Sequence, residues 1–396
     1  MFTSYRALLA RDQAPSLALA CGLGWLSFSG YGLAMILAVH SATHSFATAG
    51  VAVAAFSVGS GLLAPVRGRL IDRHGPGALG YLATGHLLGA TVLLIGCSGG
   101  QRPLLLFPGA GLAGACAPPI IATARSMWTS VAGPELAGVG HALNAAIADA
   151  AQIASPAFTG ALALLASPNV ALATLVVGAA GASWLLSARN RPYAAARRRQ
   201  AAHRVWGVLR ESAGLRTIVA GDLAIGGSLG ALEVAVTAVA ASTGTAELGA
   251  LPLAACAVGS ITLSLWSGSR RSLPSAGSRY VAGSVLVALV LPLTLLTQSV
   301  GLIAGILMFA GAGVGLLNVA VFELLDHVAP ADRATEAFTW LTTSQAAGLA
   351  IGAAGAGRLT QINPRASLLL VIGFAALAAA TAFARRRSLM PDRADV

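Results

Sequence analysis

Runs of apolar residues, each about 20 residues long, alternate with short polar gaps along this 396-residue chain. A helix of about 20 apolar residues can cross the hydrocarbon core of a bilayer, and it satisfies its own backbone hydrogen bonds there. The chain is therefore predicted to be an all-α membrane protein with twelve transmembrane helices. The expected runs form two sets of six: 16–40, 47–66, 77–98, 103–124, 139–166 and 169–188, then 215–241, 249–268, 280–298, 300–322, 337–357 and 367–384.

Composition agrees with a membrane location. Hydrophobic residues make up 56% of the chain and charged residues 10%, and the mean hydropathy is +0.77. A soluble globular protein carries about 25% charged residues. The chain has no Lys and is rich in Ala and Gly, which is typical of a GC-rich bacterial genome. A bacterial cytoplasmic (inner) membrane is therefore the expected location.

The 25 basic residues, all of them Arg, fall mainly in every second gap between the apolar runs. Loops that stay in the cytoplasm retain Arg and Lys, so these gaps are assigned to the cytoplasm, and both termini with them. Only Arg102, Arg358 and Arg365 fall in gaps on the other side. Because this pattern already accounts for the net charge of +11, no nucleic-acid partner is expected.

The longest polar interruption divides the chain into two parts. We expect an N-terminal six-helix half at 1–188, a basic cytoplasmic linker at 189–213 and a C-terminal six-helix half at 214–396. Two six-helix halves are a common layout of secondary transporters. Within the linker, Arg residues around Trp206 suit either a short amphipathic helix on the inner leaflet or a solvated connector.

The gap after the second run carries the clearest motif. It reads Gly68, Arg69, Leu70, Ile71, Asp72, Arg73, His74 and Gly75. This stretch resembles the G-x-L-x-D-R-x-G signature of the major facilitator superfamily, which occupies the same loop in twelve-span members. The resemblance implies the major facilitator fold, with a substrate cavity between the halves and alternating access. It also implies a conformational latch at Gly68, Asp72, Arg73 and Gly75, because glycines allow a tight turn and Asp72 can meet a helix N-terminus or an Arg.

The fifth run resembles a second signature of the same family, the proton-antiporter sequence G-x-x-x-G-P-x-x-G-G. Pro156 and Gly160 match, and Ser155 is one of the small residues at the other glycine positions. Small residues allow close helix packing and Pro can kink a membrane helix, so these three residues are added to the latch. In the fourth run the family usually has an Arg and a Gln, where this chain has Leu105 and Pro108.

Acidic residues inside the apolar runs are candidates for proton coupling, because a charged Asp at the bilayer centre costs about 2.5 to 3.5 kcal/mol on insertion scales. Asp149, Asp222 and Glu233 meet this criterion. Asp222 and Glu233 fall within about 20° of the same helix face. We expect Asp149 or Glu233 to exchange a proton against substrate. Two alternatives stay open: either acid pairs with a neighbouring donor, or it binds a cationic substrate.

Polar and aromatic residues in four runs are candidates for substrate binding. They are Trp25, Phe28 and Met35 in the first run, His141, Asn144 and Gln152 in the fifth, Asn318 in the tenth, and Trp340 and Ser344 in the eleventh. An aromatic wall with Met suits a bulky amphipathic ligand. The alternative for any one of them is packing against lipid or another helix.

The function expected from these features is secondary active transport, with proton-coupled export of an amphipathic drug or natural product. An importer or uniporter of a small metabolite is the alternative within transport, and a membrane sensor or scaffold is the alternative from another class. The sequence contains no phosphate-binding loop, no metal-ligand spacing and no paired nucleophile and base. We therefore expect no enzyme activity, no cofactor, no metal and no ATP. The expected partners are the substrate, protons and the lipid bilayer, around a monomer.

Overall fold

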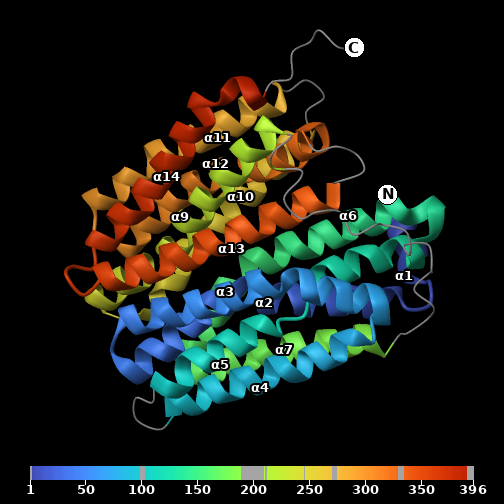
Figure 1. Ribbon diagram of the computed structural model, residues 1–396, viewed down its shortest axis with the longest axis horizontal. Helices are drawn as coiled ribbons and strands as arrows, with labels where there is room; N and C mark the ends of the chain where they lie inside the picture. Colours follow the sequence, from blue (N-terminus) through green and yellow to red (C-terminus); the bar gives the residue numbers. More distant parts are fainter. Residues whose placement is uncertain are drawn as a thin grey trace.

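The computed structural model describes residues 2–98, 103–188, 209, 212–244, 246–269, 274–328 and 334–389, and every regular element among them is helical. The elements are α1 (Phe2–Leu9), α2 (Ala14–Thr43), α3 (Phe46–His74), α4 (Ala78–Ser98), α5 (Pro103–Ala115), α6 (Ile120–Leu165), α7 (Pro168–Ser187), α9 (Ala213–Thr243), η2 (Ala246–Gly249), α10 (Ala250–Ser269), α11 (Ala276–Val290), η3 (Leu291–Leu296), α12 (Val300–Val328), α13 (Ala334–Leu359), α14 (Ala366–Ala384) and η5 (Arg386–Leu389). Figure 1 shows them as one bundle of long helices.

The twelve predicted runs are all helical over most of their length. Within the described residues, nine helical segments are by themselves long and apolar enough to cross a membrane. The prediction of an all-α membrane fold is therefore confirmed. The suggested amphipathic helix of the linker lies almost entirely outside the described residues.

The fourth and fifth spans differ from the sequence-based boundaries. The fourth was predicted as one helix over 103–124, but α5 ends at Ala115 and residues 116–119 are not helical. The predicted loop at 125–138 is helical on both sides of Gly133, whose φ of 66° breaks α6. Both departures have a local cause. Pro118 and Pro119 lack the N–H groups that would continue α5, and Gly133 can adopt the positive φ that interrupts α6 because it has no Cβ.

Four of the helices have a serine at the N-cap position. Ser45, Ser167, Ser212 and Ser275 each accept a hydrogen bond from the backbone N–H three residues later, at 3.1 to 3.3 Å. The first N–H groups of a helix have no partner within it, and a Ser at the N-cap satisfies one of them. Short polar gaps therefore fix where α3, α7, α9 and α11 begin.

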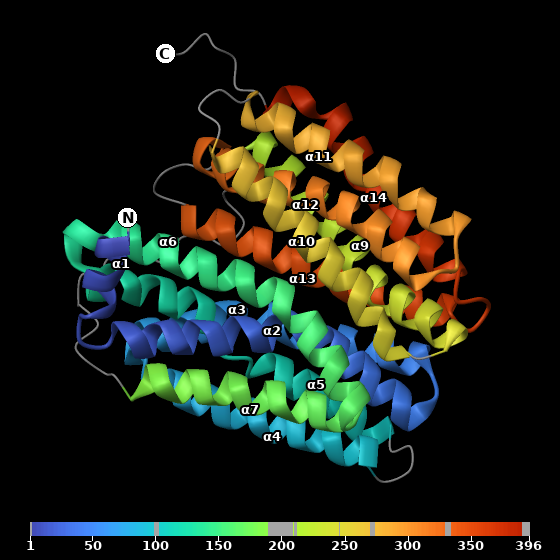
Figure 2. The same ribbon diagram turned by 180° about the vertical axis from the view of Figure 1, so that it is seen from behind.

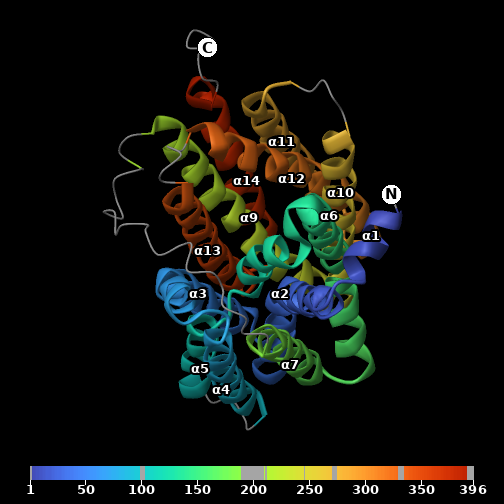
Figure 3. The same cartoon turned by 90° about the vertical axis from the view of Figure 1, so that its right-hand side faces the viewer.

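The helices pack in two groups that follow the sequence. We refer to α2–α7 as the N-terminal group and to α9–α14 as the C-terminal group. Figures 1 and 2 show the blue-to-green helices lying together and the yellow-to-red helices lying together. Seen end-on in Figure 3, α3 lies beside α13, and this pair and α6 with α10 make the largest contacts between the groups.

Glycines bring α9 and α13 into backbone contact inside the C-terminal group. A Cβ on Gly230 of α9 would clash with the carbonyl of Leu349, and a Cβ on Gly352 of α13 would clash with the carbonyl of Gly227. Small residues let membrane helices approach this closely, and van der Waals contact then holds them together. α9 also contacts α2 and α3 of the N-terminal group.

The closest contacts between the two groups lie toward one end of the bundle. We call the end where α2 begins and α14 ends the termini end, and the other the opposite end. Near the opposite end, Gly50 of α3 packs on the backbone of Ala353 in α13. There too, Gly160 of α6 packs on Ala250 of α10. These contacts hold the groups together at the opposite end.

Buried apolar clusters follow the same division. The largest cluster draws residues from both groups, with Val39 of α2 and Ala353 of α13 among them. Near the termini end the cluster around Trp128 contains only residues before α9. The cluster around Leu215 contains only residues of the C-terminal group and the chain just before it. The shared packing therefore lies away from the termini end.

Candidate functional site

Glu233 of α9 lies at the contact between the two groups. Its carboxyl group stands against Gly32 of α2, because a Cβ on residue 32 would clash with Oε2 of Glu233 and lie 3.0 Å from its Cδ. The side chain is partly exposed. Among the described residues the carboxyl group makes no hydrogen bond and no ion pair. An ionised carboxylate without a partner in apolar surroundings costs free energy.

Asp222 lies on the same face of α9 as Glu233, about 16 Å away along the helix, but it has different neighbours. Its Oδ2 lies 3.5 Å from the hydroxyl of Ser344 on α13. That hydroxyl also donates to the carbonyl of Leu341 at 2.8 Å. Asp222 therefore contacts a helix of its own group, whereas Glu233 contacts α2 of the other group.

Four candidate residues lie on α6, and the structure describes the side chains of two of them, Asn144 and Gln152. Gln152 is exposed, and Asn144 is partly exposed. Within the described part of the chain, the buried Oδ1 of Asn144 has no hydrogen-bond partner. The side chains of His141 and Asp149 lie outside the described residues. The expected roles of these two side chains therefore stay predictions.

The three candidates on α2 fall in different environments. Trp25 is partly exposed, whereas Met35 is fully buried in the largest apolar cluster. The ring of Phe28 lies 6.4 Å from that of Tyr31 and 6.3 Å from that of His86. Met35 thus packs inside the protein, whereas Trp25 and Phe28 are both partly exposed.

The candidates on the C-terminal group also differ in exposure. Asn318 of α12 is exposed, and Trp340 of α13 is partly exposed. Ser344 is buried and contacts Asp222, as described above. The structure thus joins Ser344 to one of the predicted acids, and it leaves Asn318 without a described link to them.

The turn after α3 adopts the conformation that its motif predicts. Gly75 has φ 73°, a value that favours glycine, and its N–H donates to the carbonyl of Ile71 at 2.7 Å. A Cβ on Gly68 would meet no atom within 4 Å. Arg73 is exposed, and the side chain of Asp72 lies outside the described residues. The positive φ of Gly75 explains why a glycine follows α3 at this position. The role of the motif as a conformational latch stays a prediction.

The small residues of the fifth span pack α6 against other helices. The hydroxyl of Ser155 donates to the carbonyl of Leu26 on α2. Pro156 is buried beside it. Gly160 lies against Ala250 of α10, with a built Cβ only 3.0 Å from the carbonyl of Glu247. The segment therefore joins helices within one group at Ser155 and between groups at Gly160.

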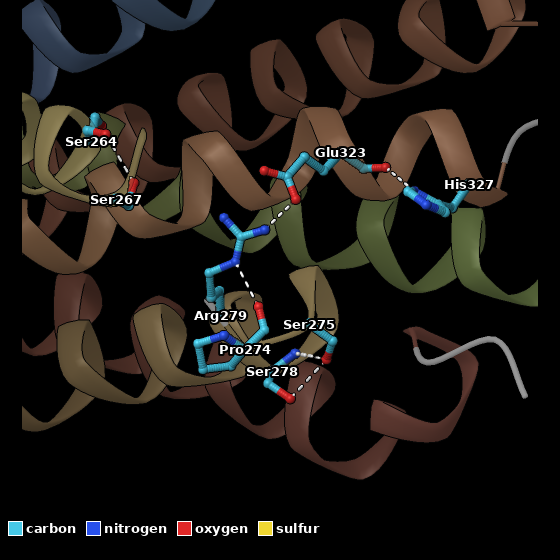
Figure 4. Close-up of polar contacts among 8 residues, drawn as sticks. All are labelled: Ser264, Ser267, Pro274, Ser275, Ser278, Arg279, Glu323 and His327. Atoms are coloured by element: carbon cyan, nitrogen blue, oxygen red, sulfur yellow. Dashed lines mark hydrogen bonds and ion pairs between the residues drawn. The ribbon is translucent and has the colours of Figure 1, made fainter. Parts of the chain in front are cut away.

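An ion pair joins α11 to α12 near the termini end. A guanidinium N–H of Arg279 donates to Oε2 of Glu323, and its Nε donates to the carbonyl of Pro274 at 3.1 Å. Figure 4 shows the Arg279 side chain reaching from α11 to Glu323, with His327 one turn further along α12. Arg279 is 8% exposed and Glu323 47% exposed. Sequence reasoning treated Arg279 only as a loop charge.

A second Arg site was missed by sequence reasoning altogether. Arg67 of α3 is buried, and its Nη1 donates to the carbonyls of Gly114 and Ala115 at the end of α5. Nδ1 of the fully buried His86 lies 2.8 Å from the carbonyl of Ala113. The sequence signal for this site is the pair Pro118 and Pro119. Because Pro has no N–H, carbonyls near the end of α5 lose their helical donors and need side-chain donors instead.

Solved structures resemble this arrangement over nearly the whole chain. The nucleoside transporter NupG matches with a TM-score of 0.72 and 14% sequence identity, covering 95% of this chain and 99% of that one. A bacterial homologue of the iron transporter ferroportin in an inward-facing state matches with a TM-score of 0.71 and 14% identity, covering 94% and 98%. The fucose:proton symporter of E. coli matches with a TM-score of 0.61 and 17% identity, covering 93% and 98%. No curated protein sequence matches the chain.

The family model described as the Major Facilitator Superfamily matches residues 17–353. The chain belongs to this superfamily. It is therefore a membrane transporter of the major facilitator type, with several membrane-spanning helices. The similarity to solved structures at such low identity concerns the fold alone.

Proposed function

We propose that this major facilitator protein couples proton movement to the export of an amphipathic small molecule, and that Glu233 carries the proton. The observation that supports this is the position of its carboxyl group. It lies between α2 and α9, against Gly32, without a described donor or cation. A neutral carboxyl group is compatible with that contact, whereas an ionised one is disfavoured.

This position gives a physical route to coupling. When Glu233 binds a proton, the two groups can close around it at the opposite end. The side chain remains partly exposed, so the proton can leave toward the accessible side. The charged form then favours separation of α2 from α9. Each protonation state thereby favours one arrangement of the groups, which is what a coupled transporter requires.

The direction of opening follows from the proposed orientation. We propose that the termini end faces the cytoplasm of a bacterium, as the Arg distribution indicates. The described arrangement is then inward-facing, since the closest contacts between groups lie at the opposite end. The halves 1–188 and 214–396, joined by the linker 189–213, would rock against each other. The turn around Gly75 and the packing at Gly160 would act as the latch.

The substrate site is proposed along the faces of α2, α6, α9 and α13 that meet between the groups. Trp25 and Trp340 are partly exposed and Gln152 is exposed, and we propose that their aromatic and amide surfaces contribute to this site. Asp222 with Ser344 supplies a second acidic position. Aromatic surface with few charges suits an amphipathic ligand. Asp149 and His141 are proposed on the same face of α6 by helical spacing alone.

Proton movement in proteoliposomes tests the proposal. Protein is reconstituted with a pH dye in the lumen, and a panel of amphipathic compounds is added outside. Exchange of compound for protons makes the lumen more alkaline, and Glu233→Gln abolishes that signal. The matched control is Glu135→Gln, which changes an exposed acid at the turn after Gly133. Acidification of the lumen would instead indicate symport and hence import. No signal across the panel from folded protein would contradict proton coupling.

A further inference from the structure

The break in the fourth span leaves backbone carbonyls without helical donors. In a continuous helix the N–H groups of residues 117 to 119 would bond the carbonyls of residues 113 to 115. Pro118 and Pro119 have no N–H, and the N–H of Ala117 donates to the carbonyl of Gly114 at 3.0 Å. The carbonyls of Ala113 and Ala115 therefore lose their helical partners. In a membrane protein such groups need other donors, since water is scarce there.

Two side chains from neighbouring helices supply these donors. Nη1 of Arg67 lies 2.8 Å from the carbonyl of Gly114 and 3.0 Å from that of Ala115. Nδ1 of His86 lies 2.8 Å from the carbonyl of Ala113, which can only accept, so Nδ1 carries the proton. All three carbonyls at the end of α5 thus have a side-chain donor from α3 or α4.

The same guanidinium also holds a turn of its own helix. Nη2 of Arg67 donates to the carbonyl of Ser60 at 2.7 Å. Ser60 lies five residues before Pro65, a residue of α3 that has no N–H. One buried cation therefore joins α3 to the broken end of α5.

The segment beyond the break packs on α2. Residues 120–132 lie between the proline break and Gly133. Ile120 lies so close to Gly24 of α2 that a Cβ there would be 2.7 Å from its Cγ2. The angle at the break therefore sets how the fourth span packs on α2, the helix whose Gly32 contacts Glu233.

We propose that Arg67 and His86 are positioning residues, which supply donors to the carbonyls that the break at Pro118 and Pro119 leaves without their regular helical partners, and so hold residues 120–132 at a fixed angle to α5. Arg67 carries the larger part, because it makes bonds to two carbonyls of α5 and to one of α3. The effect of Arg67 and His86 on the angle between α5 and residues 120–132 does not depend on the proposed function. Only the consequence of that angle for transport rests on the proposed proton coupling.

The role of Arg67 is tested by comparing Arg67→Ala in the native protein and in a variant whose backbone N–H donors at residues 118 and 119 have been restored. Arg67→Ala should lower the Tm in detergent by about 5 °C or more, whereas Arg69→Ala, an exposed Arg two residues on, should change it by less than about 1 °C. In a Pro118→Ala/Pro119→Ala background the helix regains its donors. The effect of Arg67→Ala should then fall to less than half. An equal effect in both backgrounds would overturn the proposal.

A distance measurement covers the case in which the double proline variant does not fold. Spin labels are placed at Leu112 of α5 and at Glu135, both exposed, after the four native cysteines are replaced. Arg67→Ala should broaden or shift the distance between the labels, and Arg67→Lys should do so less. Millimolar guanidinium chloride, compared with sodium chloride, should restore the distance in Arg67→Ala. An unchanged distance in Arg67→Ala would overturn the proposal, because the angle would not depend on Arg67.

Discussion

A missing side chain at position 32 decides how closely α2 approaches α9. Any Cβ there would collide with the carboxyl group of Glu233, so Gly32→Ala must push the two helices apart or turn the acid away. Overpacking of this kind costs about 1 to 3 kcal/mol. That is roughly a tenfold shift in a two-state equilibrium, or more.

The variant Gly32→Ala is therefore expected to reduce the proton signal in proteoliposomes about tenfold. Gly22→Ala on the same helix is the matched control, because its Cβ would lie 3.8 Å from the nearest atom, Cγ2 of Ile147, which is ordinary contact. Equal signals from the two variants would show that the contact at Gly32 is not part of coupling.

The ion pair between Arg279 and Glu323 makes a separate prediction about stability. Glu323→Ala leaves the mostly buried Arg279 with only the carbonyl of Pro274 as described acceptor. We expect a loss of about 1 kcal/mol, limited because Glu323 is half exposed. The loss is measured by thermal unfolding in detergent. The double variant Arg279→Ala/Glu323→Ala should lose less than the sum of the two single variants, and additive losses would contradict the pair.

The sequence singles out Glu233 as a candidate, but it does not indicate which residue lies against it. Acidic residues in apolar runs stand out in a sequence, and their spacing places them on one helix face. The contact between Gly32 and Glu233 joins residues two hundred positions apart, and no local pattern reports it. His86 was missed for the same reason, since only the fold brings it to the end of α5.

Close backbone contact between α9 and α13 is the strongest packing feature at the scale of elements. Gly352→Ala would place a Cβ against the carbonyl of Gly227. We expect it to destabilise the protein by about 2 kcal/mol, because backbone cannot yield as a flexible side chain can. Gly373→Ala in α14 is the control, as its Cβ would meet nothing within 4 Å. Thermal unfolding of both variants measures the difference. A Gly352→Ala variant as stable as the control would contradict this contact.

The positions of the helices could be predicted well from the sequence, but the break in the fourth span could not. Hydropathy reports the length of an apolar run and is blind to a change of direction inside it. The two prolines at 118 and 119 signal a kink, yet the sequence does not show which donors replace theirs. Arg67 was counted among the charges of a loop, whereas the structure buries it against α5.

At the scale of the whole molecule, contact between α3 and α13 joins the two groups. A Cβ on Gly61 would lie 3.2 Å from the Cβ of Ala346, slightly closer than the usual 3.5 to 4.5 Å of a disulfide. In a variant without the native cysteines, Gly61→Cys with Ala346→Cys should form a disulfide on oxidation. Transport should stop and return on reduction.

The control for this cross-link is Gly181→Cys with Ala346→Cys. Residue 181 meets no atom within 4 Å and belongs to α7. Oxidation should leave the control active, and transport in proteoliposomes is the readout for both. Full activity of the oxidised Gly61→Cys pair, with the disulfide shown by mass, would mean that α3 and α13 need not move apart.

We expect the protonation of Glu233 to select between two arrangements of the groups. The direct test of this expectation is the distance between the groups as a function of pH. Spin labels at Tyr81 and Ala384 report the termini end, and labels at Leu104 and Ile362 report the opposite end, all at exposed positions. Acidic pH should favour a short distance at the opposite end and a long one at the termini end, and alkaline pH the reverse, because the charged acid disfavours the contact at Gly32. Glu233→Gln should remain in the acidic arrangement at every pH. Identical pH responses of the native protein and Glu233→Gln would show that protonation of Glu233 does not select the arrangement.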